Sequence, residues 1–377
     1  MSYFLKLFDD NLIEFEVVEN LASPVIEILW INEDKKSLLP KGMKASNDSL
    51  ASWIKNRSIP KNRSFVTQFL AKCGLSVNRP MDVVNICKGL SLNDSYWITE
   101  SDEEEFEDYN LYDNNFSQVL AWIAFTGYGS SNKRGFASSP EFTTNGMLPK
   151  CWRRKSGKVF LYKGATSGAS NLGNEPYSEM YASQIARIMG INAIEYSISK
   201  WKGNLCSVCE LFTSKEVSYV PIGRIVTSGG MKAVREYYEN LGEKYVDALN
   251  EMIVFDAIIC NTDRHFGNFG LLIDSHTGDV IGPAPLFDHG NSLFNMAGDE
   301  NWYNRENMME YVNSLMPCVY DDYYTEAKKG LDKKTKEMLR KILTVQVTKK
   351  GKYNYDSKKL DMMSEIVRER ARVLLES

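Results

Sequence analysis

Apolar residues recur with helical spacing in several stretches of the chain. These stretches are 49–70 with a break at Pro60, 177–189, 245–260, 331–344 and 358–375. Glu175-Pro176 opens the second stretch and Gly190 closes it, because proline suits the first helical turn and glycine the residue after the last one. The stretch 245–260 is apolar on most sides and predicts a buried helix. Each stretch is expected to form helix, and the chain beyond residue 308 is expected to be largely helical.

Short β-prone runs separate these helices. They are 158–163, which ends at Gly164, then 205–212, 269–273 and 280–281. Asp274 to Gly278 is rich in turn-forming residues and predicts a hairpin between the last two runs. The chain is therefore expected to mix helices with short strands.

Composition indicates an ordinary globular protein. The chain has 377 residues, 43% hydrophobic and 25% charged, which suits two or three domains. The formal net charge of −4 gives no broad footprint for nucleic acid, although a local patch remains compatible with it. No run reaches the roughly 18 apolar residues of a membrane helix. Direct nucleic-acid binding and membrane insertion are therefore not expected.

Cysteine usage and the first residues bear on location. Seven cysteines, an odd number, favour reduced thiols and an intracellular, cytoplasmic protein. Met1 to Lys6 lacks the apolar stretch and cleavage site of a signal peptide. Cys206 and Cys209 form a CxxC without a second pair at zinc spacing, so a strand is preferred there over a zinc or redox site.

Two charged stretches have alternative interpretations. The acidic, aromatic stretch 100–109 is either a domain boundary region or simply solvated surface. Lys55 to Arg63 mixes basic and apolar residues, which fits either a phosphate-binding surface or a pair of helices with one solvent-exposed face. The simpler interpretation is preferred in both cases.

The chemistry concentrates between residues 261 and 290. Asp263 and Asn268 lie five residues apart after the predicted buried helix, and Asp288 follows the predicted hairpin in an Asp-x-Gly setting. Phosphoryl transfer needs a carboxylate that accepts the proton of the attacking hydroxyl and oxygen ligands that hold magnesium on the phosphates. The ordered set predicts Asp263 as the base and Asn268 and Asp288 as metal ligands. The alternative is that both aspartates only cap turns.

The same template requires a lysine on a strand and a glutamate on the next helix. Lys163 and Glu179 have that order and predict a clamp for the α- and β-phosphates, although Lys163 also suits a solvated strand end. Upstream lies the expected phosphate loop, whose backbone amides would cradle phosphate. Its residues are Thr143, Thr144, Asn145 and Gly146.

The motif Asn-x-Asp-x-His-x-x-Asn, here Asn261, Asp263, His265 and Asn268, resembles the catalytic loop of HipA-type serine/threonine kinases. Other segments are similar to further elements of that family: Pro285 to Asp288 to its metal-binding element, Ser178 to Asn192 to its glutamate-bearing helix, and Cys209 to Phe212 to its hinge. The resemblance covers roughly residues 137–375.

The resemblance implies an α+β, two-lobed protein-kinase-like fold with an N-terminal extension and a mostly helical C-terminal lobe. The expected domains are residues 1–136, of uncertain role, an N-lobe at 137–212 and a C-lobe at 213–377. ATP and Mg²⁺ would bind between the lobes, with backbone groups from Glu210 to Phe212 meeting adenine. His265 would position the catalytic loop rather than transfer protons.

Activity and partners follow from the resemblance as expectations. The family's growth-arresting members phosphorylate translation components, which implies a toxin of a toxin–antitoxin system with such a protein substrate. Residues 1–130 contain no clear helix-turn-helix, so an antitoxin would be a separate protein. Family members carry an autophosphorylated serine in the phosphate loop, where this chain has Thr143 and Thr144. A small-molecule kinase, a nucleotide-binding pseudokinase that acts as an interaction module, and a nucleic-acid binder using Lys55 to Arg63 are the alternatives.

Overall fold

The computed structural model describes residues 2–18, 25–76, 78–129, 139–166 and 173–376. The chain forms two compact units. Unit 1 comprises Met1–Lys163, Leu211–Val220 and Leu272–Ile281, and unit 2 comprises Gly164–Glu210, Pro221–Leu271 and Gly282–Ser377. The sequence-based division at residues 136 and 212 stays a prediction.

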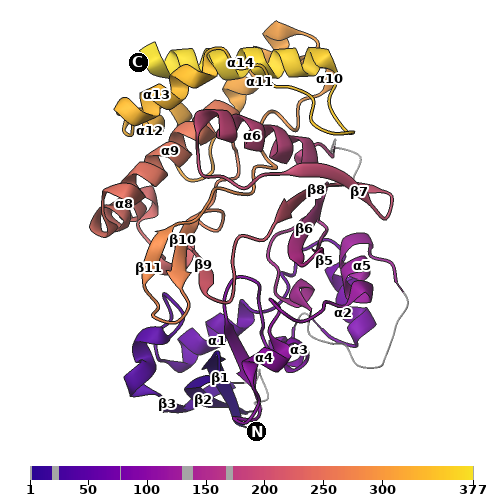
Figure 1. Ribbon diagram of the computed structural model, residues 1–377, viewed down its shortest axis with the longest axis vertical. Coiled ribbons are helices and arrows are strands. Elements are labelled where there is room, and N and C mark those ends of the chain that lie inside the picture. Colours follow the sequence, from indigo (N-terminus) through magenta and orange to yellow (C-terminus); the bar gives the residue numbers. More distant parts are fainter. Residues whose placement is uncertain (1, 19–24, 77, 130–138, 167–172, 377) are drawn as a thin grey trace. The chain divides into compact units, whose positions relative to one another are not determined.

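Unit 1 begins with an antiparallel sheet in the order β3-β2-β1-β4 (Figure 1). Its strands are β1 (Ser2–Leu7), β2 (Asp10–Val18), β3 (Val25–Ile31) and β4 (Tyr96–Thr99). In β1, Leu5 pairs with Ile13 of β2 and with Ile98 of β4, and all three are buried. Because side chains alternate along a strand, this register directs one apolar face of the sheet into a core.

Helices of unit 1 cover this sheet core, and some of them form a second hydrophobic core with one another. They are η1 (Glu33–Leu38), α1 (Asn47–Lys55), α2 (Val66–Cys73), α3 (Pro80–Cys87), α4 (Phe106–Tyr109), α5 (Gln118–Thr126) and η2 (Pro140–Phe142). Leu50 and Ile54 of α1 pack against the sheet residues, whereas Phe69 of α2 packs with Ile123 of α5 and Phe142. The helix pair expected around Pro60 is therefore present as α1 and α2.

Two further sets of strands complete unit 1. The hairpin of β5 (Lys150–Lys155) and β6 (Lys158–Gly164) turns at Ser156 and Gly157, whose φ angles of 50° and 77° are those of a tight type I′ turn. A three-stranded sheet has the order β11-β10-β9. Its strands are β9 (Val217–Pro221), β10 (Gly270–Asp274) and β11 (Val280–Pro283).

Unit 2 is mostly helical. Its elements are α6 (Glu175–Met189), β7 (Ser197–Trp201), β8 (Asn204–Glu210), α7 (Ile222–Ile225), α8 (Gly230–Leu241), α9 (Glu243–Ile259), α10 (Asp299–Trp302), α11 (Arg305–Ser314), α12 (Tyr323–Lys328), α13 (Lys333–Ile342) and α14 (Ser357–Glu376). Helix α9 is buried along most of its length and contacts α8, α12, α13 and α14 (Figure 1). Helix α6 contacts α13 and the hairpin β7–β8.

The predicted local signals act where they were expected. Pro176 lies in the first turn of α6, and Gly190 ends that helix with a φ of 84°. Cys206 and Cys209 lie in strand β8. Asp274 Oδ1 accepts the backbone N–H groups of His276 and Thr277 at 2.9 Å each in the turn between β10 and β11. Within the described residues, no helix combines the length and apolar character needed to cross a membrane.

Candidate functional site

The segment that follows α9 is fixed by Asn261. Helix α9 ends at Ile259; the next residue, Cys260, has a left-handed φ of 51°, and the chain then turns back on the helix. The buried side chain of Asn261 donates to Asp256 Oδ1 at 3.2 Å and accepts the backbone N–H of Asp263 at 3.1 Å. The end of a buried helix thus determines where Asp263 stands.

Arg264 joins this segment to the Asp-x-Gly segment. Its guanidinium is 1% exposed and donates to both carboxylate oxygens of Asp256, at 2.9 and 3.1 Å. The same group donates to the carbonyls of Asn268 at 3.0 Å and Phe287 at 2.6 Å. It also lies 3.0 Å from His289 Nδ1, which must accept because a guanidinium only donates. One buried cation therefore holds both predicted functional segments.

The Arg264–Asp256 pair is shielded from water. Burial raises the pKa of Asp256 above its ordinary value, and the charge and hydrogen bonds of Arg264 oppose that rise. Burial alone would lower the pKa of Arg264, but the carboxylate of Asp256 outweighs it, so the pKa of Arg264 is raised. Removal of either partner would leave a charge in the interior, which is costly.

Asp263 and Asn268 are bonded to each other. Asn268 Nδ2 donates to the backbone carbonyl of Asp263 at 3.0 Å. Asn291 Nδ2 donates to Asp263 Oδ2 at 3.0 Å, and the Asn291 carbonyl accepts the backbone N–H of Thr262 at 3.0 Å. Since the amide nitrogen of Asn268 is used internally, its Oδ1 is the atom that remains to meet a ligand; it accepts no hydrogen bond from the described residues.

His265 shapes the turn between these two residues. Its exposed ring accepts the backbone N–H of Gly267 on Nδ1 at 3.0 Å. A Cβ atom at Gly267 would lie 2.8 Å from the ring, closer than real Cβ contacts come. A side chain at position 267 would therefore push the imidazole out of this turn.

Asp288 has a backbone conformation that L-residues rarely adopt. Its φ is 58°, and strained angles of this kind concentrate at functional sites. Its backbone N–H donates to the hydroxyl of Tyr196 at 3.2 Å. The next N–H, of His289, donates to Glu179 Oε2 at 2.9 Å, and Glu179 on α6 is fully buried. Glu179 of α6 and Tyr196, the last residue before β7, therefore hold the strained Asp288 segment.

The predicted phosphate loop lies in unit 1, after η2. The buried Thr143 donates its hydroxyl to the carbonyl of Leu90 at 2.7 Å, and Thr144 donates to that of Pro140 at 2.6 Å. The Asn145 carbonyl accepts Lys150 Nζ at 2.8 Å, and Gly146 follows with a φ of 94°. Both threonine hydroxyls are thus engaged inside the protein.

Arg63 supports that loop. Its guanidinium, 2% exposed, donates to the carbonyls of Thr144 at 3.0 Å, Glu141 at 3.4 Å and Lys150 at 2.5 Å. Burial lowers its pKa to about 10. At least one cation of the basic segment Lys55 to Arg63 is therefore buried and bonded to backbone carbonyls inside the protein.

The remaining predicted site residues are divided between the units. Lys163 is a buried residue near the end of β6 in unit 1, whereas Glu179 belongs to unit 2, so their ion pair stays a prediction. Glu210 is the exposed last residue of β8 in unit 2. Phe212 lies in unit 1 with its ring 5.5 Å from that of Tyr219. Within unit 2 the structure brings together Glu179, Asp263, Asn268 and Asp288.

Sequence reasoning missed the residues that hold this group together. Asp256, Tyr196, Asn291 and Arg264 were given no role. A usable signal existed for Asp256, because a carboxylate inside the apolar run 252–260 needs a buried partner. Tyr196 and Asn291 carry no comparable signal, since neither is unusual in its local sequence.

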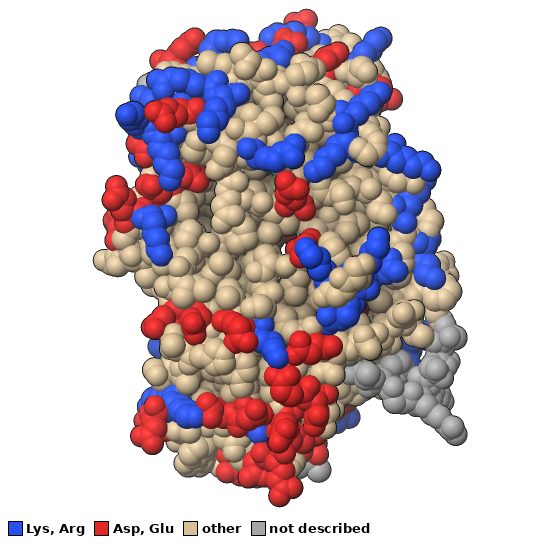
Figure 2. Space-filling model, viewed as in Figure 1, with Lys and Arg blue, Asp and Glu red and all other residues tan. Residues whose placement is uncertain are grey.

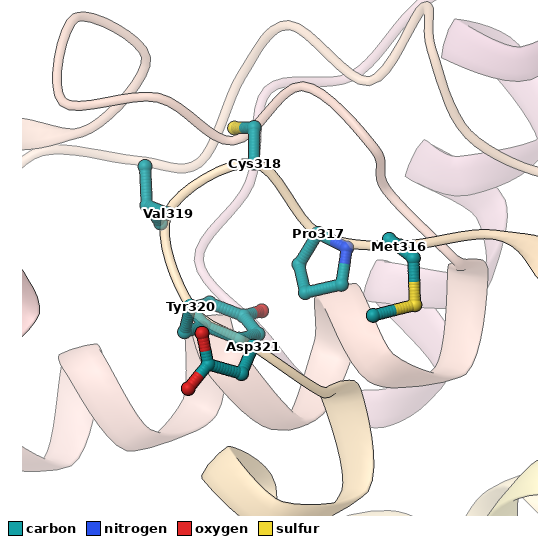
Figure 3. Close-up of a pocket in the computed structure, with 6 residues that line it drawn as sticks. All are labelled: Met316, Pro317, Cys318, Val319, Tyr320 and Asp321. Atoms are coloured by element: carbon teal, nitrogen blue, oxygen red, sulfur yellow. The ribbon is translucent and has the colours of Figure 1, made fainter.

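A hollow of about 600 Å³ lies on the loop between α11 and α12, lined by Met316, Pro317, Cys318, Val319, Tyr320 and Asp321 (Figure 3). Burial raises the pKa of the Cys318 thiol, and the negative charge of Asp263 raises it further. Asp263 is therefore close enough to the hollow for its charge to be felt there.

The donor set suits a magnesium ion held on nucleotide phosphates. Asn268 offers an amide oxygen and Asp288 a carboxylate, both hard oxygen ligands. No group of three or more His, Cys, Asp or Glu side chains arranged for a metal occurs among the described residues. Two oxygen ligands of this kind would leave the rest of a magnesium shell to phosphate and water.

No protein-family model matches the chain, and a search of curated proteins finds no match. The solved structures do contain similar folds. A Helicobacter pylori proinflammatory kinase, CtkA, aligns with 17% identity and a TM-score of 0.49 over 62% of this chain and 92% of its own. HipA of Shewanella oneidensis, solved with HipB and operator DNA, aligns with 10% identity and a TM-score of 0.55 over 100% of this chain and 99% of its own. The HipA alignment confirms the expected fold: this chain has the α+β, HipA-like kinase fold.

Proposed function

We propose that this protein is an ATP- and magnesium-dependent kinase of the HipA type that phosphorylates serine or threonine of a protein. The observation that carries the proposal is the network around Arg264, which joins the carbonyls of Asn268 and Phe287 to one buried cation. That network supports the proposal, because it ties the loop of Asp263 and Asn268 to the segment of Asp288, and phosphoryl transfer requires its groups to be held in position.

Each residue has a distinct task in this proposal. Asp263 accepts the proton of the attacking hydroxyl, and Asn291 orients the carboxylate through its bond to Oδ2. Asn268 Oδ1 and the Asp288 carboxylate hold magnesium. Magnesium-ATP, when bound, supplies the phosphoryl group and neutralises its charge. Glu179 and Tyr196 keep the Asp288 backbone in its strained conformation.

In the proposal, the remaining residues take the tasks that the family resemblance implies for them. Lys163 and Glu179 clamp the α- and β-phosphates, and backbone amides from Thr143 to Gly146 cover the phosphates. Backbone groups from Glu210 to Phe212 meet adenine. Glu179 would serve two groups at once, because one of its oxygens already accepts the N–H of His289.

The hollow at Met316 to Asp321 is the proposed entrance for the acceptor. Asp263 raises the pKa of Cys318 by its charge, so a chain lying over this loop would bring a hydroxyl toward the base. Met316, Pro317 and Val319 offer apolar contacts, which suit a peptide segment better than a small polar molecule. A protein substrate is therefore preferred over a small-molecule one.

The proposed setting is the cytoplasm, with a separate antitoxin-like protein as partner and a translation component as substrate. Support for a partner comes from the HipA structure, which was solved with HipB and operator DNA. Toxicity and substrate identity follow only from the resemblance of the catalytic segment to that family.

The test is the intact mass of the protein after incubation with magnesium-ATP, with wild type and Asp263→Asn compared. Wild type is expected to gain a phosphoryl group, and Asp263→Asn is expected not to gain one while it keeps its nucleotide affinity. Peptide mapping would then separate Thr143 from Thr144. Thr144 is the expected acceptor, because Thr143 is the more deeply buried of the two.

Two outcomes would contradict the proposal. Equal phosphorylation of wild type and Asp263→Asn would remove Asp263 from the mechanism. Nucleotide binding without transfer to itself, to added proteins or to small molecules would favour the pseudokinase. Transfer to small molecules alone would leave a kinase but exclude the protein substrate.

A further inference from the structure

The stretch between α13 and α14 carries a concentrated positive charge. Residues 338–355 contain five basic side chains and no acidic one, although the whole chain has a net charge of −4. The five are Arg340, Lys341, Lys349, Lys350 and Lys352. Figure 2 shows many Lys and Arg side chains, with Asp and Glu side chains among them, over the part of the molecule where α12, α13 and α14 lie. This local excess is unlike the balanced charge of the rest of the sequence.

The loop that carries the last three lysines is firmly attached to α6. Gln184 bonds Thr348 in both directions, accepting its N–H at 2.9 Å and donating to its carbonyl at 3.2 Å. Asn354 Oδ1 accepts the backbone N–H of Lys350 at 2.7 Å and the hydroxyl of Tyr181 at 3.3 Å. The loop is therefore a built turn with fixed lysine positions, not a solvated tail.

Lysines surround an aromatic ring on this loop. Lys200 of β7 lies 5.4 Å from the centre of the Tyr353 ring, and Lys352 lies 5.6 Å from it. Lys200, Lys349 and Lys352 are exposed, whereas Lys350 is half-buried with its ammonium 3.5 Å from the Tyr196 carbonyl. Strand β7 and the loop thus form one surface, which we call the lysine-loop surface: Lys200, Lys349, Lys350, Lys352 and Tyr353.

The charge of this surface is not neutralised by nearby acids. None of its four lysines forms an ion pair with a described carboxylate. Neighbouring lysines behave differently: Lys334 pairs with Asp247 and Glu251, and Lys359 pairs with Asp299. The Tyr353 ring attracts the ammonium groups of Lys200 and Lys352 only weakly, so these like charges still repel one another, and a bound polyanion would relieve that repulsion.

We infer that the lysine-loop surface binds single-stranded nucleic acid. Such ligands require lysines that follow a phosphate backbone and an aromatic ring that stacks with a base. The Tyr353 ring becomes available for stacking when the ammonium groups of Lys200 and Lys352, which lie over it, move to the phosphates. A lipid surface fits less well, because the loop adds no exposed large apolar side chain that could enter a bilayer. This inference goes beyond the proposed kinase activity and does not depend on it.

The test is fluorescence anisotropy of the full chain with a labelled single-stranded RNA of about 20 nucleotides, long enough to span an aromatic-lined basic site. Wild type is expected to bind, with log K falling against log salt by about 0.7 for each phosphate contacted. The variant Lys200→Glu/Lys349→Glu/Lys352→Glu should bind at least about tenfold more weakly, with a shallower salt slope. Lys350 is left unchanged because it bonds the interior.

The matched control reverses three charges in unit 1: Lys44→Glu/Lys55→Glu/Lys61→Glu. It should bind RNA as wild type does. Tyr353→Ala should weaken binding about fivefold or more, while Tyr353→Phe should retain it, because stacking needs the ring and not the hydroxyl. Equal unfolding midpoints would confirm that all variants are folded.

Three results would overturn the inference: no binding by wild type, no loss in the lysine-loop variant, or loss in the control instead. Polyglutamate of matched length and vesicles containing phosphatidylserine are the competing probes. If either displaced RNA as well as unlabelled RNA does, the surface would be a general anion surface, and its assignment to nucleic acid would be wrong.

Discussion

The side-chain amide of Asn268 donates a hydrogen bond to the backbone carbonyl of Asp263, with 3.0 Å between the two atoms. This hydrogen bond determines the orientation of the Asn268 amide group. The nitrogen faces the catalytic loop, so the oxygen is presented outward, where a cation could bind it. The same residue therefore braces the proposed base and supplies a proposed metal ligand.

Asn268→Ala should separate these two tasks through magnesium dependence. Loss of an outer-shell partner typically weakens metal binding by about 10- to 100-fold, so loss of a direct ligand should weaken it by at least about tenfold. We expect ATP affinity measured by calorimetry with magnesium to fall by that factor. Affinity measured with a chelator present should stay as in wild type. An equal loss under both conditions would show that Asn268 acts only on the loop.

Arg264→Met should destabilise unit 2 strongly. The substitution leaves the Asp256 carboxylate buried without its partner, which typically costs about 3–5 kcal/mol. Urea unfolding followed by fluorescence would measure the loss. The double variant Arg264→Met/Asp256→Leu removes both charges and should recover part of the stability. A double variant no more stable than the single one would contradict the role given to the buried pair.

Much of the fold could be predicted from local patterns. The helices α6, α9, α13 and α14 and the hairpin β10–β11 have amphipathic or apolar periodicity and clear turn residues, and the structure has them where they were expected. The sheet β1–β4 was not predicted, and although β1, β2 and β3 pair locally, β4 pairs with β1 from about ninety residues away in sequence. Long-range pairing of this kind leaves little trace in a local pattern.

The proposed ligands of the candidate site can be named from the sequence, whereas the residues that support them cannot. Asp263, Asn268 and Asp288 lie in motifs with informative spacing. Tyr196 lies 92 positions from the backbone group that it bonds, so only the folded chain shows its role. Supporting residues of this type are determined by tertiary packing, and spacing along the sequence does not reveal them.

Tyr196 should make stability depend on alkaline pH. Burial, together with the nearby charge of Glu179, raises its pKa well above the ordinary value of 10 in the folded protein. Below pH 10 the phenol is protonated in both states. Above pH 10 the unfolded chain loses a proton that the folded protein keeps, so stability falls as pH rises, by about 1.4 kcal/mol per pH unit for one group.

Tyr196→Phe isolates that contribution. The variant should unfold at lower urea at neutral pH, because the N–H of Asp288 loses its partner at a cost of about 1–3 kcal/mol. Between pH 10 and 11 the unfolding free energy of the variant should fall less steeply than that of wild type. The two slopes should differ by about 1.4 kcal/mol per pH unit, the contribution of one titrating group. Other buried tyrosines, among them Tyr181 and Tyr355, remain in both proteins and supply the common part of the slope. Identical slopes would remove Tyr196 from the titration.

Cys318 offers a direct test of the distance between the hollow and the proposed base. Among the seven cysteines it is the one that is exposed, while Cys73 is half-buried and the others are buried. Brief treatment of the native protein with N-ethylmaleimide should therefore add a single label, at Cys318. Burial and the charge of Asp263 both raise the pKa of this thiol, which lowers the thiolate fraction available for reaction.

Asp263→Asn should consequently be labelled faster than wild type at the same pH, because the thiol loses a repelling neighbour. Asp247→Asn is the matched control, because it also removes one carboxylate. Asp247 lies on α9, and its carboxylate is not among the groups that raise the pKa of Cys318. Labelling rates followed by intact mass between pH 7 and 9 would measure the difference. A labelling rate unchanged by Asp263→Asn would show that the charge of Asp263 does not reach Cys318. The hollow would then no longer be the proposed entrance for the acceptor. A faster rate, together with loss of phosphoryl transfer but not of ATP binding in labelled wild type, would place the acceptor over Cys318.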